Sequence, residues 1–387
     1  MDETIATAKQ AAIEVLLHNL RGPYRGLPRT AGWGYPEPYT RDLLIASLGM
    51  LLSREQRLVN AVRKMLTVLA RNQTKRGHIP SLVHDPGNRG ASDTTPLFIL
   101  ALGFYRNFSG EGDFLEDAAR RAIRWMDYQS PDDSVMVAQM PTTDWRDEQW
   151  VMGFGLFVNT VVYGYLRLYG EHEKALMLKS LMSGLTVTAD KRHKHVHDGL
   201  RLAEKPYFAL SSFKIYSNER FDLLGNSLAI LTGLTSPRRA VKIIAWVEAE
   251  CRELRAKGDL ALALPPNLFP YIRPDDPDWL SRFDRYNRPG MYHNGGIWPF
   301  ICGFYIAAAV AAGKMRIAER NLKALAEAVK MAASPKLTFG FNEYLSAQDG
   351  LPRGQDWQTW SAAMFIYAAE CVERGQTPFF DKIRAAP

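Results

Sequence analysis

Carboxylic acids recur beside amides and aromatic residues at six places in the sequence, each just before or at the start of an apolar helical stretch. The six clusters are Tyr39–Asp42, Ala91–Pro96, Asp144–Trp150, Asn218–Asp222, Tyr292–Trp298 and Gly354–Gln358. Carboxylic groups can cleave glycosidic bonds, and tryptophan rings can stack on sugars. If the helices that follow converge at their N-termini, the clusters form one cleft suited to binding and cutting a sugar.

Cleavage of a glycosidic bond normally needs two carboxylic groups. One protonates the leaving oxygen, and the other activates water or attacks the sugar. The acids at the predicted rim of the cleft are Asp42, Asp93, Asp144, Asp147, Glu148, Glu219, Asp222, Glu343, Asp349 and Asp356.

Asp93 precedes a predicted helix in which Thr95 suits the N-cap and Pro96 the first helical position. Asp93 would then be free to reach into the cleft. Leu97 and Phe98 would help to raise its pKa, as a general acid requires, whereas the positive end of the helix would lower it. An ordinary acid at a helix start explains Asp93 equally well.

Glu343 lies in the predicted loop 339–344, which carries aromatic residues on both sides of it. It is neither an obvious helix cap nor part of a run of charges. It therefore suits a base that holds a water molecule against a sugar ring. An exposed loop glutamate is the alternative interpretation.

The other clusters give weaker signals. Capping and an ion pair with Arg41 explain Asp42, although the pair could also hold sugar hydroxyls. His293 and Asn294 precede two glycines, which permit close approach of a ligand. Five tryptophans could either stack on a sugar ring or belong to the hydrophobic core: Trp145, Trp150, Trp298, Trp357 and Trp360.

Three histidines, His193, His195 and His197, alternate in a lysine-containing segment and would share one face of a strand. The interleaved lysines favour a solvated hairpin over a metal site. The sequence has no phosphate-binding loop, dinucleotide fingerprint or nucleophile elbow. We therefore expect neither a metal nor a cofactor.

Helical periodicity is readable in twelve segments: 3–20, 41–53, 55–73, 95–108, 112–129, 149–169, 171–188, 220–233, 236–257, 294–312, 314–333 and 356–374. Every second segment, beginning with 41–53, is poor in charge, and those between them carry a charged face. This alternation is what two concentric rings of helices require, with the inner ring buried.

Connections from the outer to the inner helices are long, which places the function on one face. The pairs Asp198-Gly199 and Asp349-Gly350 predict small β-hairpins among these loops. Because no linker or break in composition interrupts the chain, residues 1–387 are expected to form a single domain.

The composition, 47% hydrophobic and 23% charged, is typical of a soluble globular enzyme. The net charge of +7 comes from basic residues scattered over predicted outer helices, so no nucleic-acid partner is expected. The three cysteines and the lack of a signal-peptide pattern favour the cytoplasm. The uncharged stretches 150–166 and 297–313 predict buried helices rather than membrane spans.

These motifs resemble those of the alkaline/neutral invertases, inverting glycoside hydrolases with an (α/α)6 barrel. The most similar stretches are Arg220–Leu231, Tyr292–Pro299 and Asn342–Tyr344, with Gly77–Ser81 and Gln358–Ser361 also alike. The resemblance implies an all-α fold, a six-hairpin (α/α)6 toroid with long loops and small β-hairpins on one face.

In that family an aspartate that opens the second inner helix is the general acid, and a glutamate in the loop before the last helix is the base. By position, the resemblance implies these roles for Asp93 and Glu343. The predicted substrate-binding residues are Tyr39, Arg41, Asp42, His78, Asp144, Trp145, Arg146, Glu219, His293, Asn294, Trp298 and Gln358.

The family typically follows its acid with Ser-Gly, whereas Asp93 is followed by Thr94-Thr95-Pro96, as in debranching-type and other α-glucosidase barrels. We expect an inverting hydrolase that cleaves the α-glycosidic bond of a small saccharide, with sucrose as the first candidate. Glucosylglycerate or a maltooligosaccharide is the alternative substrate. A sugar epimerase, a polysaccharide lyase or a non-catalytic sugar-binding protein could use the same rings of helices, and a homo-oligomer is compatible with the sequence.

Overall fold

The computed structural model describes residues 2–24, 26–131, 133–184, 186–187, 199–214 and 216–386. Helices predominate in these ranges, as the sequence predicts. Six of them are buried almost throughout: α2 (Thr40–Leu52), α4 (Thr94–Ser109), α6 (Leu156–Leu168), α8 (Leu223–Leu231), α11 (Pro299–Ala311) and α13 (Thr359–Arg374). Six are partly exposed: α1 (Glu3–Asn19), α3 (Gln56–Asn72), α5 (Glu116–Asp127), α7 (His172–Gly184), α9 (Pro237–Ala256) and α12 (Met315–Ala328).

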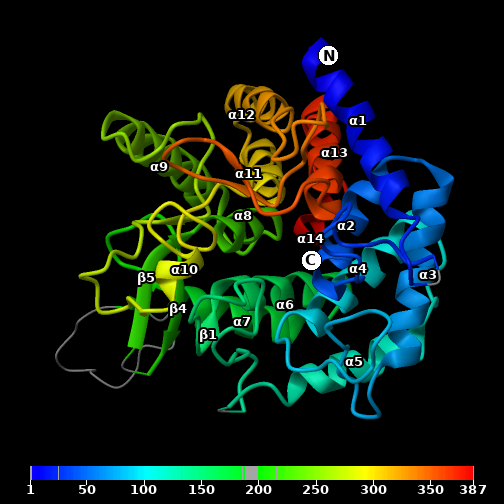
Figure 1. The fold of residues 1–387 in the computed structure, drawn as a ribbon. Coiled ribbons are helices and arrows are strands. Elements are labelled where there is room, and N and C mark those ends of the chain that lie inside the picture. Colours follow the sequence, from blue (N-terminus) through cyan, green and yellow to red (C-terminus); the bar gives the residue numbers. More distant parts are fainter. Residues whose placement is uncertain are drawn as a thin grey trace.

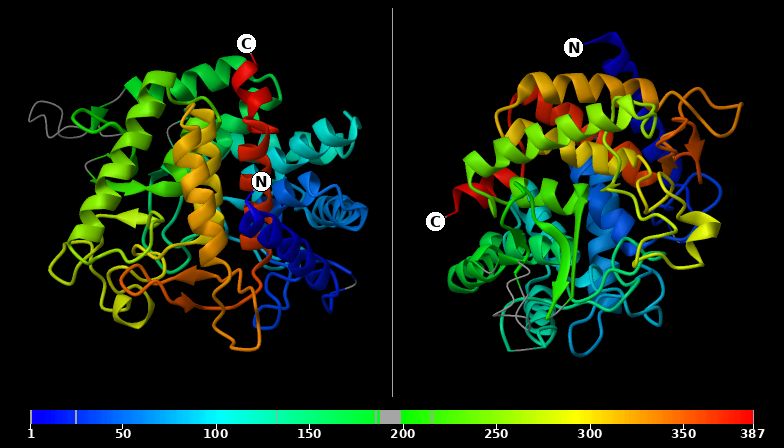
Figure 2. Two further views of the ribbon diagram at one scale, coloured as in Figure 1. Left: turned by 90° about the horizontal axis from the view of Figure 1, so that it is seen from above. Right: turned by 90° about the vertical axis from the view of Figure 1, so that its left-hand side faces the viewer.

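The six buried helices contact one another in chain order. Helix α2 contacts α4, and the series continues through α6, α8, α11 and α13, which packs against α2 again. Each buried helix also contacts one partly exposed helix: α2 with α3, α4 with α5, α6 with α7, α8 with α9, α11 with α12, and α13 with α1. Figures 1 and 2 show the second set lying outside the first.

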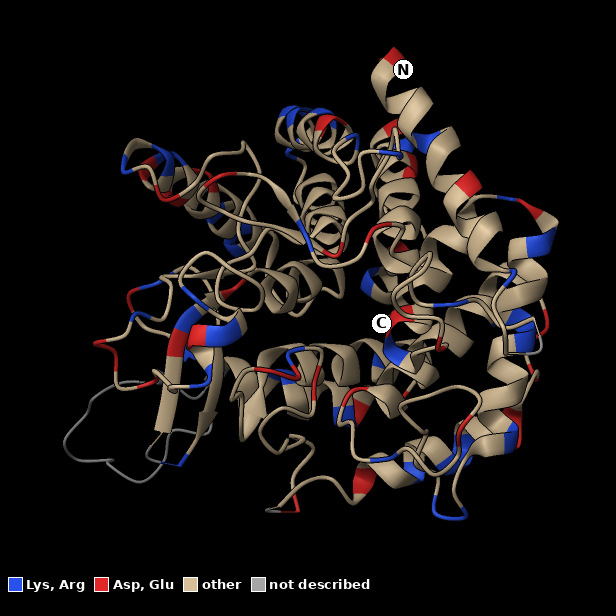
Figure 3. Ribbon diagram, viewed as in Figure 1, with Lys and Arg blue, Asp and Glu red and all other residues tan. Residues whose placement is uncertain are grey.

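Side-chain polarity explains which helices are inside. The residues of α11 from Pro299 to Val310 are all buried, and none is charged. In α5, by contrast, four apolar residues are buried while the remaining positions carry most of its charge. Figure 3 shows the inner helices largely free of charged residues. The two uncharged stretches of the sequence became the inner helices α6 and α11, and no described helix is long and apolar enough to cross a membrane.

Glycines allow α13 to pack closely against both of its neighbours. A Cβ atom on Gly49 of α2 would lie 1.8 Å from the carbonyl oxygen of Ala363 in α13. A Cβ atom on Gly303 of α11 would lie 2.7 Å from the carbonyl oxygen of Met364. Real side chains do not tolerate such distances to backbone, so the series of inner helices closes through these two glycine contacts.

Short strands occur in the long loops. One antiparallel sheet has the order β1 (Phe154–Gly155), β4 (Ala209–Phe213), β5 (Tyr216–Asp222) and β6 (Leu268–Phe269). The hairpin predicted around Asp349-Gly350 is present as β7 (Tyr344–Leu345) and β8 (Pro352–Arg353). Strands β2 (Thr186–Val187) and β3 (Arg201–Leu202) pair in parallel. Asp198 of the hairpin expected at Asp198-Gly199 lies outside the described residues, as do the histidines His193, His195 and His197. The short helices α10 (Phe283–Tyr286) and α14 (Phe380–Ala385) were not predicted.

Four inner helices begin later than the sequence predicts, at Leu156, Leu223, Pro299 and Thr359. The residues before them are extended or irregular: Arg220 to Asp222 belong to β5, and Pro299 starts α11. Proline suits that first position because it has no N–H to leave unpaired. The polar clusters therefore precede the inner helices, where their side chains can turn toward one another.

Candidate active site

A cavity lies at the N-terminal ends of the inner helices. Arg41 and Asp42 come from the first turn of α2, while Trp298 and Gln358 are the N-cap residues of α11 and α13. The residues that line the cavity are Thr30, Tyr35, Tyr39, Arg41, Asp42, Trp145, Asp147, Tyr292, His293, Trp298, Glu343, Gln358 and Trp360. Eight of the predicted site residues are among them: Tyr39, Arg41, Asp42, Trp145, His293, Trp298, Glu343 and Gln358.

Glu343 is fixed in the wall of this cavity and is 7% exposed. The backbone N–H of Gln355 donates to Oε2 at 3.1 Å, and the Tyr292 hydroxyl lies 3.5 Å from Oε1. Burial raises the pKa of Glu343 to about 7, against the opposing hydrogen bond from Gln355. Gly354, at φ +71°, lets the backbone pass the carboxylate, because a Cβ there would meet Oε2 at 2.2 Å. The alternative of an exposed loop glutamate is therefore wrong.

Two further acids share the cavity with Glu343. Asp42 is 7% exposed, and burial raises its pKa to about 7, with Asp147 and Glu343 adding to the rise and Arg41 opposing it. Capping does not explain Asp42, because Tyr39 is the N-cap residue of α2 and no side chain caps that helix. The side chain of Asp147 is 60% exposed, so it is the solvent-facing member of these three acids.

Asp93 lies beneath the cavity rather than in its wall. It is fully buried and forms a two-point ion pair with Arg41, whose Nε donates to Oδ2 and whose Nη2 donates to Oδ1 at 3.2 Å. Burial raises the pKa of Asp93 to about 6 although the pair with Arg41 lowers it. Arg41 lines the cavity and Asp93 does not, so Arg41 links the Asp93 carboxyl to the cavity.

The start of α4 differs from the expected one. The helix begins at Thr94, and Asp93 occupies the N-cap position without accepting a capping hydrogen bond. Thr95 is not the cap, because its hydroxyl accepts from the Ile79 N–H at 3.0 Å and lies 3.2 Å from His78 Nδ1. These bonds tie the loop at residues 77–79 to α4. Asp93 is thereby left to pair with Arg41.

Aromatic rings form one wall of the cavity. His293 stacks on Tyr292 at a ring separation of 4.0 Å and on Trp298 at 5.5 Å, and it meets the edge of Trp145. Burial, together with the charges of Arg146 and Arg41, holds the pKa of His293 well below its usual value, so the ring is neutral at pH 7. Flat apolar faces beside hydrogen-bonding groups suit a sugar ring.

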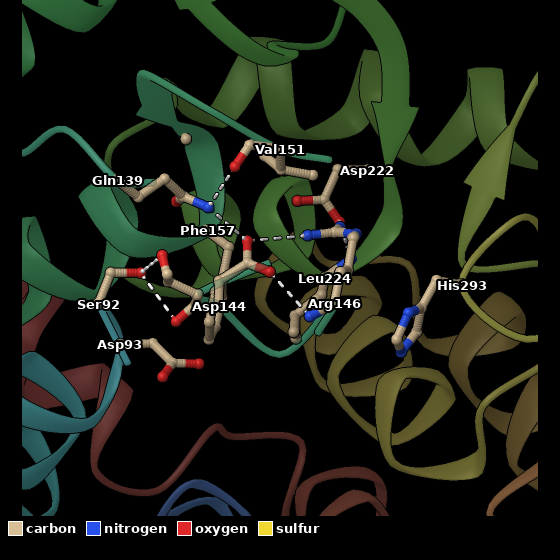
Figure 4. A network of polar contacts seen from close by, with 12 residues as sticks. Ser92, Asp93, Gln139, Asp144, Arg146, Val151, Phe157, Asp222, Leu224 and His293 are labelled. Atoms are coloured by element: carbon tan, nitrogen blue, oxygen red, sulfur yellow. Dashed lines mark hydrogen bonds and ion pairs between the residues drawn. The ribbon is translucent and has the colours of Figure 1, made fainter. Parts of the chain in front are cut away.

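Asp144 and Arg146, predicted to line the sugar subsites, are instead fully buried beside the cavity. Arg146 pairs with Asp144 at 3.4 Å and with Asp222, and its guanidinium lies over the ring of Trp145. Gln139 donates to Asp144 at 3.0 Å (Figure 4). This network joins the loop before α6 to the start of α8. Its role is to hold Trp145 and that loop in place.

Three other predicted residues also lie away from the cavity. His78 packs against Trp125 in a separate cavity. Glu219 is exposed on β5. The Asn294 side chain is fully buried, and its amide group forms hydrogen bonds with the backbone of Ile272 and Asn287. In each case the polar group serves local structure or faces solvent elsewhere.

Two cavity residues, Thr30 and Tyr35, were missed because the segment before α2 has no helical pattern. Thr30 accepts from the Tyr39 N–H at 3.0 Å, and its carbonyl accepts from the Thr359 N–H at 2.8 Å. Burial, followed by the charge of Glu343, raises the pKa of Tyr35. A run of Tyr and Trp between residues 33 and 39 was the available signal.

A model of the alkaline and neutral invertase family matches residues 210–375. Probable alkaline/neutral invertase F from Arabidopsis thaliana is 30% identical over 154 residues, which are 38% of this chain and 28% of that protein. Cytosolic invertase 1 from Oryza sativa subsp. japonica is 29% identical over 159 residues, which are 40% of this chain and 26% of that protein. The chain thus spans less than a third of the length of these relatives.

Among solved structures, a GH63 mannosylglycerate hydrolase from Thermus thermophilus, in complex with Tris and D-glycerate, superposes with a TM-score of 0.67. It is 14% identical, and the match covers 93% of this chain and 99% of that one. A wild-type glycosidase gives a TM-score of 0.64 at 13% identity, covering 96% and 99% of the two chains. The fold is therefore that of these glycosidases.

The resemblance inferred from the motifs around Asp222, His293 and Glu343 is thus confirmed by the family match, which includes all three residues. Over residues 210–375 this chain is similar to the alkaline and neutral invertases, and it has the fold of the glycosidases compared above.

Proposed function

We propose that the protein is an inverting glycoside hydrolase that cleaves the α-glycosidic bond of a small saccharide, with sucrose as the first candidate. One observation carries the proposal: buried carboxyl groups with raised pKa values and aromatic faces meet where the inner helices begin. Relatedness to invertases and to GH63 glycosidases supports it. We further propose that the two sets of helices form an (α/α)6 barrel and a single domain.

Glu343 acts as the general base in this proposal. Its carboxylate is held by the Gln355 N–H and faces the cavity, so it can take a proton from water. Asp93 acts as the general acid. Because Arg41 holds both oxygens of Asp93 and lines the cavity, bound substrate must displace or share that guanidinium for the proton to reach the leaving oxygen. Inversion predicts carboxyl groups about 6.5–9.5 Å apart, with water between them.

The pKa values of Asp93 and Glu343 restrict the pH range in which the proposed catalyst is active. The productive form has Asp93 protonated and Glu343 ionised, although Asp93 has the lower pKa, about 6 against about 7. Because this order of pKa values is the reverse of the one that the mechanism favours, only a minority of molecules is in that form at any pH. Substrate that excludes water from Asp93 would raise this share, since burial favours the neutral carboxyl.

A glycosylglycerate is the second candidate substrate. The structural match to the mannosylglycerate hydrolase covers almost the whole of that chain, whereas the invertase matches cover less than a third of theirs. A cytoplasmic location is proposed because one matched relative is a cytosolic invertase and the three cysteines are unpaired.

A product-release screen separates these candidates. Purified protein is offered sucrose, trehalose, maltose and glucosylglycerate, and reducing sugar is measured. We expect release from sucrose, with glucosylglycerate next. Ligand binding without turnover on the whole panel would favour a sugar-binding protein instead, and formation of a sugar epimer without hydrolysis would favour an epimerase.

A further inference from the structure

A second cavity in the described part of the chain is lined by six basic residues and no acidic one. They are Lys179, Arg201, Lys205, Arg238, Arg239 and Lys242. We call it the basic cavity. It shares no lining residue with the candidate active site, and Leu234, Thr235 and Ser236 in its wall follow the C-terminal end of α8. The active site lies at the opposite ends of the inner helices.

The charges of the basic cavity are not neutralised by the described protein. None of the six side chains forms an ion pair with a described acidic residue. Arg239 is held by the carbonyl oxygens of Pro206 at 2.7 Å and Tyr207 at 2.8 Å, which fix its guanidinium without cancelling its charge. Glu250 interacts with Lys205 through its charge but does not line the cavity.

The charge on Arg239 is opposed first by burial and then by a neighbouring like charge. Burial and the neighbouring charge of Arg201 lower the pKa of Arg239 to about 10. Such a lowering means that the folded protein disfavours this charge in the absence of a counter-ion. An anion in the cavity would remove that penalty.

Two further features suit an anion. The N-terminus of the twenty-residue helix α9, capped by Ser236, opens at the wall of the cavity, and helix N-termini favour negative charge. Thr235, which also lines the cavity, is 7% exposed, and its hydroxyl has no hydrogen-bond partner among the described residues. A buried hydroxyl without a partner is unusual and is satisfied when a ligand oxygen is near.

We propose that the basic cavity binds a small molecule that carries a phosphate group. Arginine forks and a helix N-terminus recognise the three oxygens of a phosphate better than a single carboxylate, and a phosphate dianion offsets part of the excess positive charge. The concave shape favours a small molecule over a flat macromolecular surface. The inference does not depend on the glycosidase proposal, because the two sites are separate.

Isothermal titration of the full chain with inorganic phosphate and with glycerol 3-phosphate, at constant ionic strength, tests the proposal. We expect one saturable site, and tighter binding of glycerol 3-phosphate would identify a phosphate ester as the ligand, whereas equal affinity would identify free phosphate. Arg238→Glu should weaken binding by about tenfold or more, since it places a negative charge beside the anion. Lys242→Glu, one turn further along α9, should act likewise.

Arg252→Glu is the matched control, because Arg252 is exposed on the same helix but does not line the basic cavity. It should leave the affinity unchanged within about twofold, as expected for a screened surface charge. The proposal is overturned if neither phosphate binds at millimolar concentration. Equal weakening by Arg252→Glu, or unchanged binding in both Arg238→Glu and Lys242→Glu, overturns it as well.

Discussion

Arg41 is the residue on which the chemistry of Asp93 depends. It lines the cavity and at the same time holds both oxygens of the Asp93 carboxylate. The side chain of Asp93 is fully buried in this pair, so Asp93 could act as the general acid or position Arg41. A general acid and a positioning residue respond differently to the leaving group of the substrate.

Asp93→Asn should lower kcat on sucrose by about 100-fold or more, which is the usual contribution of a general acid. The same variant should keep most of its activity on an aryl α-glucoside with an acidic phenol, because that leaving group departs without a proton. Steady-state kinetics on both substrates provide the measurement.

Asp349→Asn is the control for this comparison, since Asp349 is an acid of the predicted rim that pairs with Arg353 in the β7–β8 hairpin and does not line the cavity. It should leave both activities near those of the unaltered chain. Equal losses of Asp93→Asn on the two substrates would show that Asp93 only positions Arg41.

The pH dependence follows from the same two carboxyl groups. Below about pH 6 both Asp93 and Glu343 are protonated and the proposed base is lost, whereas above about pH 7 both are ionised and the proposed acid is lost. We expect kcat/KM on sucrose to form a narrow bell between these limbs. With the activated aryl glucoside, the alkaline limb should disappear because no acid is required. A profile on sucrose that stays level up to pH 9 would contradict the assignment.

At the scale of elements, the buried pairs of Arg146 connect the loop before α6 to β5 and α8. Removing Arg146 leaves Asp144 and Asp222 buried beside each other without their counter-charge. Breaking a buried pair in this way typically costs about 3–5 kcal/mol of unfolding free energy. Arg146→Met should show a loss of that size in urea unfolding.

Arg353→Met gives the matched control, because its ion pair with Asp349 is partly exposed. Such surface pairs contribute about 0–1 kcal/mol. If Arg146→Met costs no more than this control, the buried network does not hold the two elements together.

The inner helices were predictable because a helix that is buried on all sides appears in the sequence as a long stretch without charged residues. Their first turns were not predictable, since residues 220–222 carry the same apolar and charged mixture whether they lie in β5 or in a helix. Strands β1 and β6 are only two residues long, below the length at which a period of two can be read. Their pairing with β4 and β5 depends on contacts distant in sequence.

The candidate site was predictable to a similar degree. Arg41, Asp42, Trp298 and Gln358 line the cavity because the N-terminal ends of inner helices meet there. The sequence does not reveal which polar side chains hydrogen-bond to loop backbone and so do not face the cavity. Asn294 is an example: it was predicted to bind the ligand, but its amide hydrogen-bonds to the backbone of Ile272. Those bonds form only once distant segments have packed.

At the scale of the whole molecule, the contact of α13 with α2 joins the last inner helix to the first. Replacing glycine by alanine inside a helix normally stabilises it by about 0.5–1 kcal/mol. Gly49→Ala should do the opposite, because its Cβ would lie 1.8 Å from the Ala363 carbonyl oxygen. Overpacking of this kind costs about 1–3 kcal/mol, which thermal unfolding detects.

Gly112→Ala is the corresponding control, since no atom lies within 4 Å of the position its Cβ would take. It should change the unfolding temperature little. A Gly49→Ala variant as stable as the unaltered chain would mean that α2 and α13 do not close the series of helices as tightly as described.

We propose hydrolysis by single displacement at the N-terminal ends of the inner helices. Proton NMR during the first minutes of sucrose hydrolysis tests it most directly, because it reports the anomer of glucose before mutarotation. The account predicts that β-glucose appears first and that Glu343→Gln, but not the exposed control Glu219→Gln, abolishes its release. Initial release of α-glucose, or full activity of Glu343→Gln, would contradict it.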